Sequence, residues 1–229
     1  MQSMRLAGLL SGGKDSVYAA HLAQEQGHTL EYLVSLRSKN PDSYMFHTVN
    51  IDLTGLQAEA WGIQYVSAET MGVKEEELRD LKKALEKLDI DGVITGAIAS
   101  KYQADRIDRL CEELDLHHFH PLWGRDREKL LYEMQQSGMN IIFSAVAAYG
   151  LDQNWLGQPL TAQRIRKLKE LNQKYGVDMC GEGGEYESLV IDAPWFTHRI
   201  NINAAKKTWD GSSGRYNIME ACLKPKATT

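Results

Sequence analysis

Short apolar segments alternate with helical segments over the first half of the chain, and this alternation restricts the fold more than any other feature of the sequence. The apolar segments lie at residues 5–10, 32–36, 64–67, 92–95 and 117–119. The helices predicted between them span residues 15–26, 49–61, 74–88 and 100–114. Such alternation is typical of βαβ units, so we predict an α/β fold with an open parallel sheet of about five strands.

The sequence changes character after Pro121. The periodicity predicts helices over residues 126–136 and 161–175, with an apolar run at 139–147 and late strand-like stretches at 199–204 and 216–223. We therefore predict a smaller C-terminal α+β domain. The predicted boundary divides the chain into residues 1–122 and 123–229.

Charge and cysteine content narrow the class of protein. Lys and Arg total 26 against 31 Asp and Glu, a net charge of −5 without a basic run, so nucleic acid is not an expected partner. No apolar stretch approaches the roughly 18 residues of a membrane span. The three cysteines, Cys111, Cys180 and Cys222, are widely spaced, which favours a reducing, cytoplasmic setting over a disulfide framework.

The sequence SGGKDS at residues 11–16, the first glycine loop, stands between a predicted strand and a predicted helix. Adjacent glycines let backbone N–H groups approach phosphate oxygens, and the helix N-terminus adds positive charge. Gly8 and Gly13 imitate the spacing of a Walker A loop, but Gly8 falls inside the strand. Asp15 stands where that loop needs a hydroxyl, and a carboxylate there can hold Mg²⁺. The alternative is an ordinary glycine turn.

The sequence GEGGEYES at residues 181–188 begins with a second glycine loop, residues 181–185. Its glycines favour a backbone that neither a helix nor a strand would adopt, so we predict a turn. The glutamates Glu182, Glu185 and Glu187 concentrate negative charge around Tyr186, which suits a cation better than a nucleotide. The alternative is a tight turn whose glutamates are solvated or cap the backbone.

Two further groups of polar residues follow predicted strands. Tyr102, Gln103 and Arg106 come after the strand at 92–95, where the ligand crevice of an open parallel sheet lies. Arg106 is placed to reach a phosphate or a carboxylate, or to form an ion pair with Asp105 or Glu113.

Three histidines, His117, His118 and His120, follow the fourth helix. Adjacent histidines on a strand point to opposite faces, which disfavours one shared metal ion.

The first glycine loop resembles the pyrophosphate loop of ATP pyrophosphatases, which cut ATP between its α and β phosphates. The segments 43–47, 96–103 with Arg106, 121–125 and 181–188 extend the resemblance to nearly the whole chain, and together they resemble the diphthine–ammonia ligase (diphthamide synthase) family. The resemblance implies a sheet like that of the adenine nucleotide alpha hydrolases (HUP type), with an ATP-binding N-terminal domain and a substrate-binding C-terminal domain.

The implied activity is that of a ligase forming a C–N bond. Diphthine on translation elongation factor 2 is amidated by ammonium at the expense of ATP, through an acyl-adenylate, giving diphthamide, AMP and pyrophosphate. Free ammonium is the expected nitrogen donor because the two assigned domains leave no room for a glutaminase domain. ATP and Mg²⁺ are the implied cofactors, and the oligomeric state, including a homo-oligomer, stays open.

The resemblance also assigns roles to residues. It implies catalytic roles for Lys14, Asp15 and Arg106, with Asp15 on the metal. The implied ATP-binding residues are Ser11, Gly12, Gly13, Lys14, Asp15, Ser16, Gly96, Tyr102 and Gln103. The implied substrate-binding residues are Tyr44, Glu182, Gly183, Gly184, Glu185, Tyr186 and Glu187. We hypothesise that Glu182 and Glu185, with Tyr186, Trp155 or Trp195, hold the trimethylammonium group of diphthine by charge and cation–π attraction.

Three alternatives remain at this stage. A tRNA thiolase would use a similar loop, although such enzymes usually show paired cysteines or a basic surface. A relative acting in a cobalamin-related amidation would keep the chemistry and change the substrate. A sensor would bind ATP without turning it over.

Overall fold

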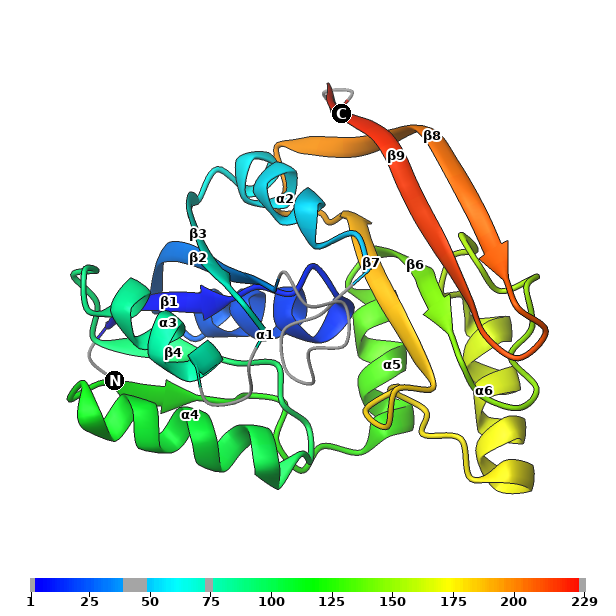
Figure 1. Ribbon diagram of the computed structural model, residues 1–229, viewed down its shortest axis with the longest axis horizontal. Helices are drawn as coiled ribbons and strands as arrows, with labels where there is room; N and C mark the ends of the chain where they lie inside the picture. The colour runs from blue at the N-terminus through cyan, green and yellow to red at the C-terminus, as the bar shows by residue number, and fades with distance from the viewer. Residues whose placement is uncertain (1–2, 39–48, 73–75, 227–229) are drawn as a thin grey trace.

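The computed structural model describes residues 3–38, 49–72 and 76–226. Its first sheet is entirely parallel, with the strand order β3-β2-β1-β4-β5. The strands are β1 (Arg5–Leu9), β2 (Thr29–Ser38), β3 (Gln64–Thr70), β4 (Gly92–Ile94) and β5 (His117–Phe119). The predicted α/β class with five parallel strands is therefore confirmed (Figure 1).

Helices cover both faces of this sheet, as the βαβ pattern requires. One buried cluster packs α1 (Lys14–Glu25) and α2 (Thr54–Trp61) against Leu6 and Leu33. A second cluster packs α3 (Glu76–Leu85) and α4 (Lys101–Glu113) against the opposite face. Cys111 is 2% exposed in this second cluster, so its role there is packing.

The predicted helix over residues 49–61 begins later than the sequence suggests. A short 3₁₀ turn, η1 (Ile51–Leu53), precedes α2, and Asn50 adopts a left-handed backbone with a φ of 66°. The Asn50 side chain donates to the Tyr216 carbonyl at 2.9 Å and accepts from the Ile218 N–H at 2.9 Å. These two hydrogen bonds to a distant strand take the place of helical hydrogen bonds at Asn50. The local sequence periodicity does not reveal this replacement.

The second sheet is antiparallel, with the order β7-β6-β9-β8. It contains β6 (Asn140–Val146), β7 (Tyr186–Asp192), β8 (His198–Trp209) and β9 (Gly214–Pro225), with α5 (Arg127–Gln136) and α6 (Ala162–Tyr175) beside it. The two late strands are longer than predicted and form one hairpin (Figure 1). The turn predicted from Gly181, Gly183 and Gly184 is present, and directly after it β7 begins at Tyr186 and pairs with β6.

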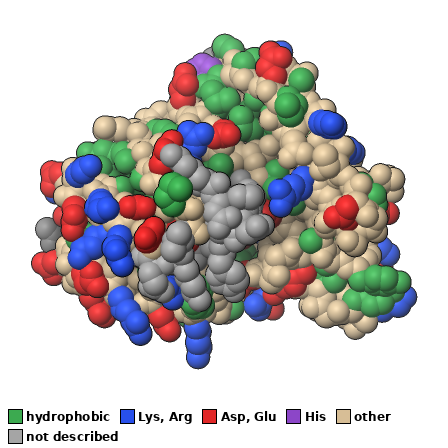
Figure 2. All heavy atoms as spheres, viewed as in Figure 1, with side chains coloured by type: hydrophobic (Ala, Val, Ile, Leu, Met, Phe, Trp, Pro, Cys, Tyr) green, Lys and Arg blue, Asp and Glu red, His purple; other side chains and the backbone are tan. Residues whose placement is uncertain are grey.

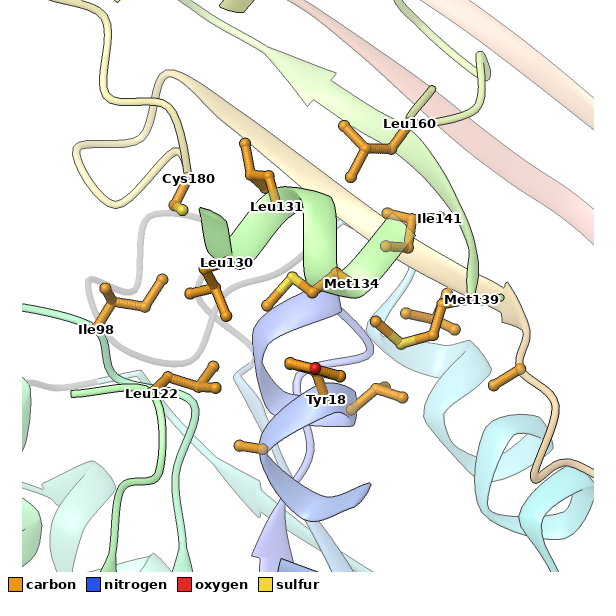
Figure 3. Close-up of a cluster of buried hydrophobic side chains, with 14 of the residues drawn as sticks. Tyr18, Ile98, Leu122, Leu130, Leu131, Met134, Met139, Ile141, Leu160 and Cys180 are labelled. Carbon is orange, nitrogen blue, oxygen red and sulfur yellow. The ribbon is translucent and has the colours of Figure 1, made fainter. Parts of the chain in front are cut away.

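The two halves of the chain share one hydrophobic core. Figure 3 shows Tyr18 of α1 facing Met134 of α5, with Leu130, Leu131 and Ile141 around them. Leu130, Leu131 and Met134 are each fully buried, so their burial stabilises the contact between the first sheet and the second half of the chain. The division into residues 1–122 and 123–229 stays a prediction.

The surface over α3 and α4 carries acidic and basic side chains side by side (Figure 2). Lys82 of α3 donates to Glu113 of α4 at 2.7 Å, which links the two helices across solvent-exposed positions. Within the described ranges, no helix combines the length and the apolar character that crossing a membrane requires.

Candidate functional site

A cavity of about 680 Å³ lies at the carboxyl end of the parallel sheet. Strand β1 has β2 on one side and β4 on the other, so the chain changes direction across the sheet between β1 and β4. Ligands of open α/β sheets bind at this kind of position. The first glycine loop follows β1 and Gly96 follows β4, and both line the cavity.

Hydroxyl groups hold the first glycine loop in its shape. Ser16 Oγ donates to the Gly13 carbonyl at 3.1 Å and lies 3.1 Å from Ser11 Oγ. Ser11 Oγ in turn accepts from the Gly13 N–H at 3.3 Å. Gly12 has a φ of +86°, a region that favours glycine. These contacts fix the loop where α1 begins, so backbone N–H groups at the helix N-terminus are placed for an anion.

Gly96 packs directly on the backbone of the first glycine loop. A Cβ atom at this position would lie 2.6 Å from both the Asp15 carbonyl carbon and the Ser16 nitrogen. Backbone atoms cannot move aside as a flexible side chain can. The close approach of β4 to the start of α1 therefore requires glycine.

Lys14 is buried, with 2% of its surface exposed. Its Nζ donates to Asp15 Oδ2 at 2.8 Å and to the Cys180 carbonyl at 2.5 Å, and it lies 5.0 Å from the centre of the Tyr186 ring. Burial by itself lowers the pKa of Lys14, but the neighbouring Asp15 carboxylate outweighs that effect and holds the pKa above its ordinary value. Lys14 is therefore a permanent cation in the wall of the cavity.

Strand β7 binds the first glycine loop along its length. The Lys14 N–H donates to Ser188 Oγ at 3.1 Å, and the Val190 N–H donates to the Gly12 carbonyl at 3.0 Å. Gln57 is fully buried and donates to the carbonyls of Gly12 at 2.9 Å and Val190 at 2.7 Å. Sequence reasoning missed Gln57, because a single glutamine within a helical pattern carries no local signal of burial.

The second glycine loop is held by its own acidic side chains. Glu182 accepts from the N–H groups of Ile98 at 2.9 Å and Ala99 at 3.2 Å, which joins this loop to the segment after β4. Glu185 accepts from the N–H groups of Asp178 at 3.0 Å and Gly183 at 2.9 Å. These two carboxylates therefore cap backbone groups, as the second of our two interpretations of the loop predicts.

Asp178 organises the same loop and was also missed by the sequence analysis. Its Oδ1 accepts from the N–H groups of Cys180 at 2.8 Å and Gly181 at 3.1 Å, and its Oδ2 lies 2.6 Å from Arg127 Nε. Arg127 is the first residue of α5 and also approaches Glu182 at 3.7 Å. A carboxylate ahead of a glycine turn was the available signal.

The aromatic part of the trimethylammonium hypothesis is not supported for either tryptophan, because neither lines the cavity. Trp155 packs on Phe143, and Trp195 stacks on His21 with ring centres 3.5 Å apart. Tyr186 does line the cavity, but it is 3% exposed and its hydroxyl donates to the Met179 carbonyl at 2.7 Å.

The structure brings most of the other predicted residues together. Gln103 and Glu187 line the cavity, whereas Glu185, Tyr102 and Arg106 do not. The Arg106 guanidinium lies 4.5 Å from the centre of the Tyr102 ring. The predicted residue Tyr44 and its neighbours at 43–47 lie outside the described residues. The cavity also has apolar lining, which consists of Leu9, Leu10, Val34, Leu36, Ile51, Leu81 and Ile107.

The carboxylate of Asp15 is suited to bind a magnesium ion. Asp15 Oδ1 is buried, and among the described residues it has no hydrogen-bond partner. Its other oxygen is held by Lys14. A buried carboxylate oxygen beside an anion-binding loop suits a hard cation that also contacts phosphate oxygens.

A glycine loop lies between a parallel strand and a helix N-terminus, at the point where the chain changes direction across the sheet. This arrangement defines an α/β protein of the class that has its ligand site at this point, with a loop suited to an anion. Family models narrow this class. The diphthamide synthase N-terminal domain matches residues 4–118, and the diphthamide synthase C-terminal domain matches residues 126–223. The chain belongs to the diphthamide synthase family.

Curated relatives bear one name. A diphthine–ammonia ligase of Danio rerio is 38% identical over 225 residues, which cover 89% of this chain and 88% of that protein. The diphthine–ammonia ligase of Homo sapiens is 37% identical, covering 89% of this chain and 84% of that protein. That of Schizosaccharomyces pombe is 36% identical and is matched over 40% of its length. A solved subunit described as a predicted part of a tRNA methyltransferase from Methanocaldococcus jannaschii superposes with a TM-score of 0.47 at 14% identity, covering 83% of this chain and 98% of that one.

Proposed function

We propose that this protein is a diphthine–ammonia ligase. It amidates the carboxylate of diphthine on translation elongation factor 2, with ammonium as nitrogen donor and with cleavage of ATP to AMP and pyrophosphate. The names and the coverage of its relatives support this reaction. We propose further that residues 1–122 supply the ATP site and residues 123–229 most of the substrate site.

The observation that carries the proposal is the contact between two motifs that lie far apart in the sequence. Lys14 of the first glycine loop donates from its backbone to Ser188 and from its side chain to the carbonyl of Cys180. The same cavity is lined by Gly181, Glu182 and Glu187. A nucleotide in the first loop would therefore have its phosphates directly beside the second motif, as transfer of an adenylyl group to a protein substrate requires.

The chain's own residues account for the first chemical step. A carboxylate is a poor electrophile, so it must be activated before ammonia can displace an oxygen leaving group. The first glycine loop and Lys14 would hold the departing pyrophosphate and offset its charge. Asp15 would hold Mg²⁺, which supplies positive charge to the phosphate oxygens when it is bound. The apolar lining from Leu36, Leu81 and Ile107 suits the adenine ring.

The test is a product assay on the purified chain with elongation factor 2 carrying diphthine, ammonium, ATP and Mg²⁺. We expect AMP, pyrophosphate and diphthamide in equal amounts, and no release when the modified factor is omitted. Without ammonium we expect no diphthamide and at most the pyrophosphate of the adenylation step. Lys14→Gln keeps much of the side-chain volume but removes the charge, so it should lower turnover by at least ~100-fold. The matched control Lys169→Gln changes an exposed lysine of α6 that pairs with Glu128, and it should leave turnover unchanged.

Two results would contradict the proposal. ATP binding without any AMP release under the complete conditions would indicate a sensor instead of an enzyme. AMP release that depends on a different carboxylic acid or on tRNA, and not on the modified factor, would keep the nucleotide chemistry and reject the substrate.

A further inference from the structure

A cluster of metal-binding side chains lies outside the candidate active site, where α4 meets the end of β5. Asp108 comes from α4, His118 from β5, and His120 from the residue just after it. One ligand atom from each of the three side chains lies within 4.8 Å of the other two. The sequence disfavoured an ion shared by adjacent histidines, but His118 and His120 are two residues apart. Their rings lie on the same side of the strand, with centres 5.0 Å apart.

We propose that Asp108, His118 and His120 form a binding site for Zn²⁺. Two imidazoles and one carboxylate are ligands that zinc favours, and a fourth position is left for water. In a tetrahedral site with bonds of about 2.1 Å, neighbouring ligand atoms lie about 3.4 Å apart. His118 Nδ1 and Asp108 Oδ1 are 2.6 Å apart, so a zinc ion would take the place of the proton between them after a small separation.

The surroundings of His118 suit a metal ligand. Its side chain is 5% exposed, whereas Asp108 is 46% exposed and is free to adjust. The second ring nitrogen, Nε2, lies 2.8 Å from Thr95 Oγ1. Metal-bound histidines commonly donate their other N–H group to an oxygen in this way, which fixes the ring.

Thr95 links this cluster to the candidate active site. It directly follows β4, its N–H donates to the Phe119 carbonyl at 2.8 Å, and it lines the cavity next to Gly96. An ion held by His118 would therefore fix the position of the Thr95 hydroxyl. The zinc site does not depend on the proposed reaction, since none of its three ligands is among the described residues that line the cavity.

The experiment uses the metal-free full chain without an affinity tag, titrated with Co²⁺ as the probe in excess Mg²⁺ so that Asp15 is occupied. We expect one Co²⁺ per chain with the visible absorption of a four-coordinate or five-coordinate ion and no thiolate band, and we expect Zn²⁺ to displace it. His118→Gln and His120→Gln should each weaken Co²⁺ binding at least ~10-fold, and Thr95→Val should weaken it less.

His117→Gln is the matched control. His117 neighbours the ligands and is exposed, so its substitution should leave the affinity for Co²⁺ unchanged. Asp108→Asn changes an exposed side chain and should weaken binding without loss of the fold, as far-UV circular dichroism will check. The proposal is overturned if Co²⁺ does not bind saturably, or if its affinity is the same in the wild type, His118→Gln and His120→Gln. In either case the Asp108–His118–Thr95 chain is a hydrogen-bonded support only.

Discussion

The two glycine loops of this protein face the same cavity but are built differently. The first loop, residues 11–16, takes its shape from neighbours in sequence, since Ser11 and Ser16 bond to each other and to Gly13. The second loop, residues 181–185, takes its shape from carboxylates, since Asp178 accepts from the Gly181 N–H and Glu185 accepts from the Gly183 N–H. Glycine gives both loops their freedom, but hydroxyl groups shape the first and carboxylates the second. Each loop is also tied to a distant segment, the first through β7 and Gln57 and the second through Glu182.

This difference teaches how a charged motif should be interpreted. In the first loop, Lys14 pairs with Asp15, but Asp15 Oδ1 has no hydrogen-bond partner among the described residues and so can still receive a cation. In the second loop, the charges of Glu182 and Glu185 are used to hold backbone N–H groups. A dense group of glutamates is therefore weak evidence for a bound cation where nearby backbone N–H groups need acceptors.

The largest expected effect tests the close packing around the first loop. Gly96→Ala places a Cβ atom 2.6 Å from the backbone of Asp15 and Ser16, so the loop must move and turnover should fall by at least ~100-fold. The product assay measures this. Gly55→Ala is the control, because its Cβ would meet Tyr65 at an ordinary 3.5 Å, and it should change stability by less than about 1 kcal/mol. Normal turnover in Gly96→Ala would contradict the packing argument.

The next effect tests how tightly the second loop is packed. Burial raises the pKa of the Cys180 thiol to about 12. At pH 8 the reactive thiolate is therefore on the order of 10⁻⁴ of all Cys180 side chains. The rate of Cys180 alkylation should rise with pH, about tenfold for each pH unit up to pH 12, because the thiolate fraction rises in the same proportion. Native protein should consume thiol reagent at Cys222, which is partly exposed, long before Cys180 or Cys111. Cys222→Ser should remove the fast phase. A fast phase that survives would show that the second loop opens readily.

A smaller effect tests the bonds that hold the second loop. Asp178→Ala removes the carboxylate that accepts from the N–H groups of Cys180 and Gly181 and that pairs with Arg127, which should cost about 2–4 kcal/mol of unfolding free energy. Urea unfolding measures it. Asp178→Asn retains an oxygen acceptor and should lose less. Equal losses in the two variants would mean that the ion pair with Arg127 matters more than the loop hydrogen bonds.

The smallest effect distinguishes support from substrate binding at Glu185. Glu185→Gln keeps one acceptor of two, so it should lower the free energy of unfolding by about 1 kcal/mol and leave the KM for ATP unchanged. If Glu185 also contacts the trimethylammonium group of diphthine, the KM for the modified factor should rise several-fold. Glu170→Gln, an exposed change on α6, is the control. An unchanged KM for the modified factor removes Glu185 from the substrate site.

The sequence alone determined the parallel sheet, the position of the first loop and most helix limits. Ser100 and Thr161 cap α4 and α6 within one residue of the predicted starts, because capping and helical periodicity are local properties. The position of the first loop was equally accessible, since adjacent glycines between an apolar segment and a helical segment mark a turn. Its assignment as an anion site with Asp15 on a metal stays a prediction that the geometry fits.

Only the tertiary structure decided how β7 pairs, where Asn50 bonds, and what the second loop does with its carboxylates. Tyr186 shows the reason, because its ring is buried against Lys14, about 170 residues earlier in the chain, and its place in a strand depends on pairing with β6. The nearness of His118 to Asp108 depends likewise on how α4 packs beside β5. Contacts between residues far apart in the chain leave no periodic pattern in the sequence, so only the folded structure shows them.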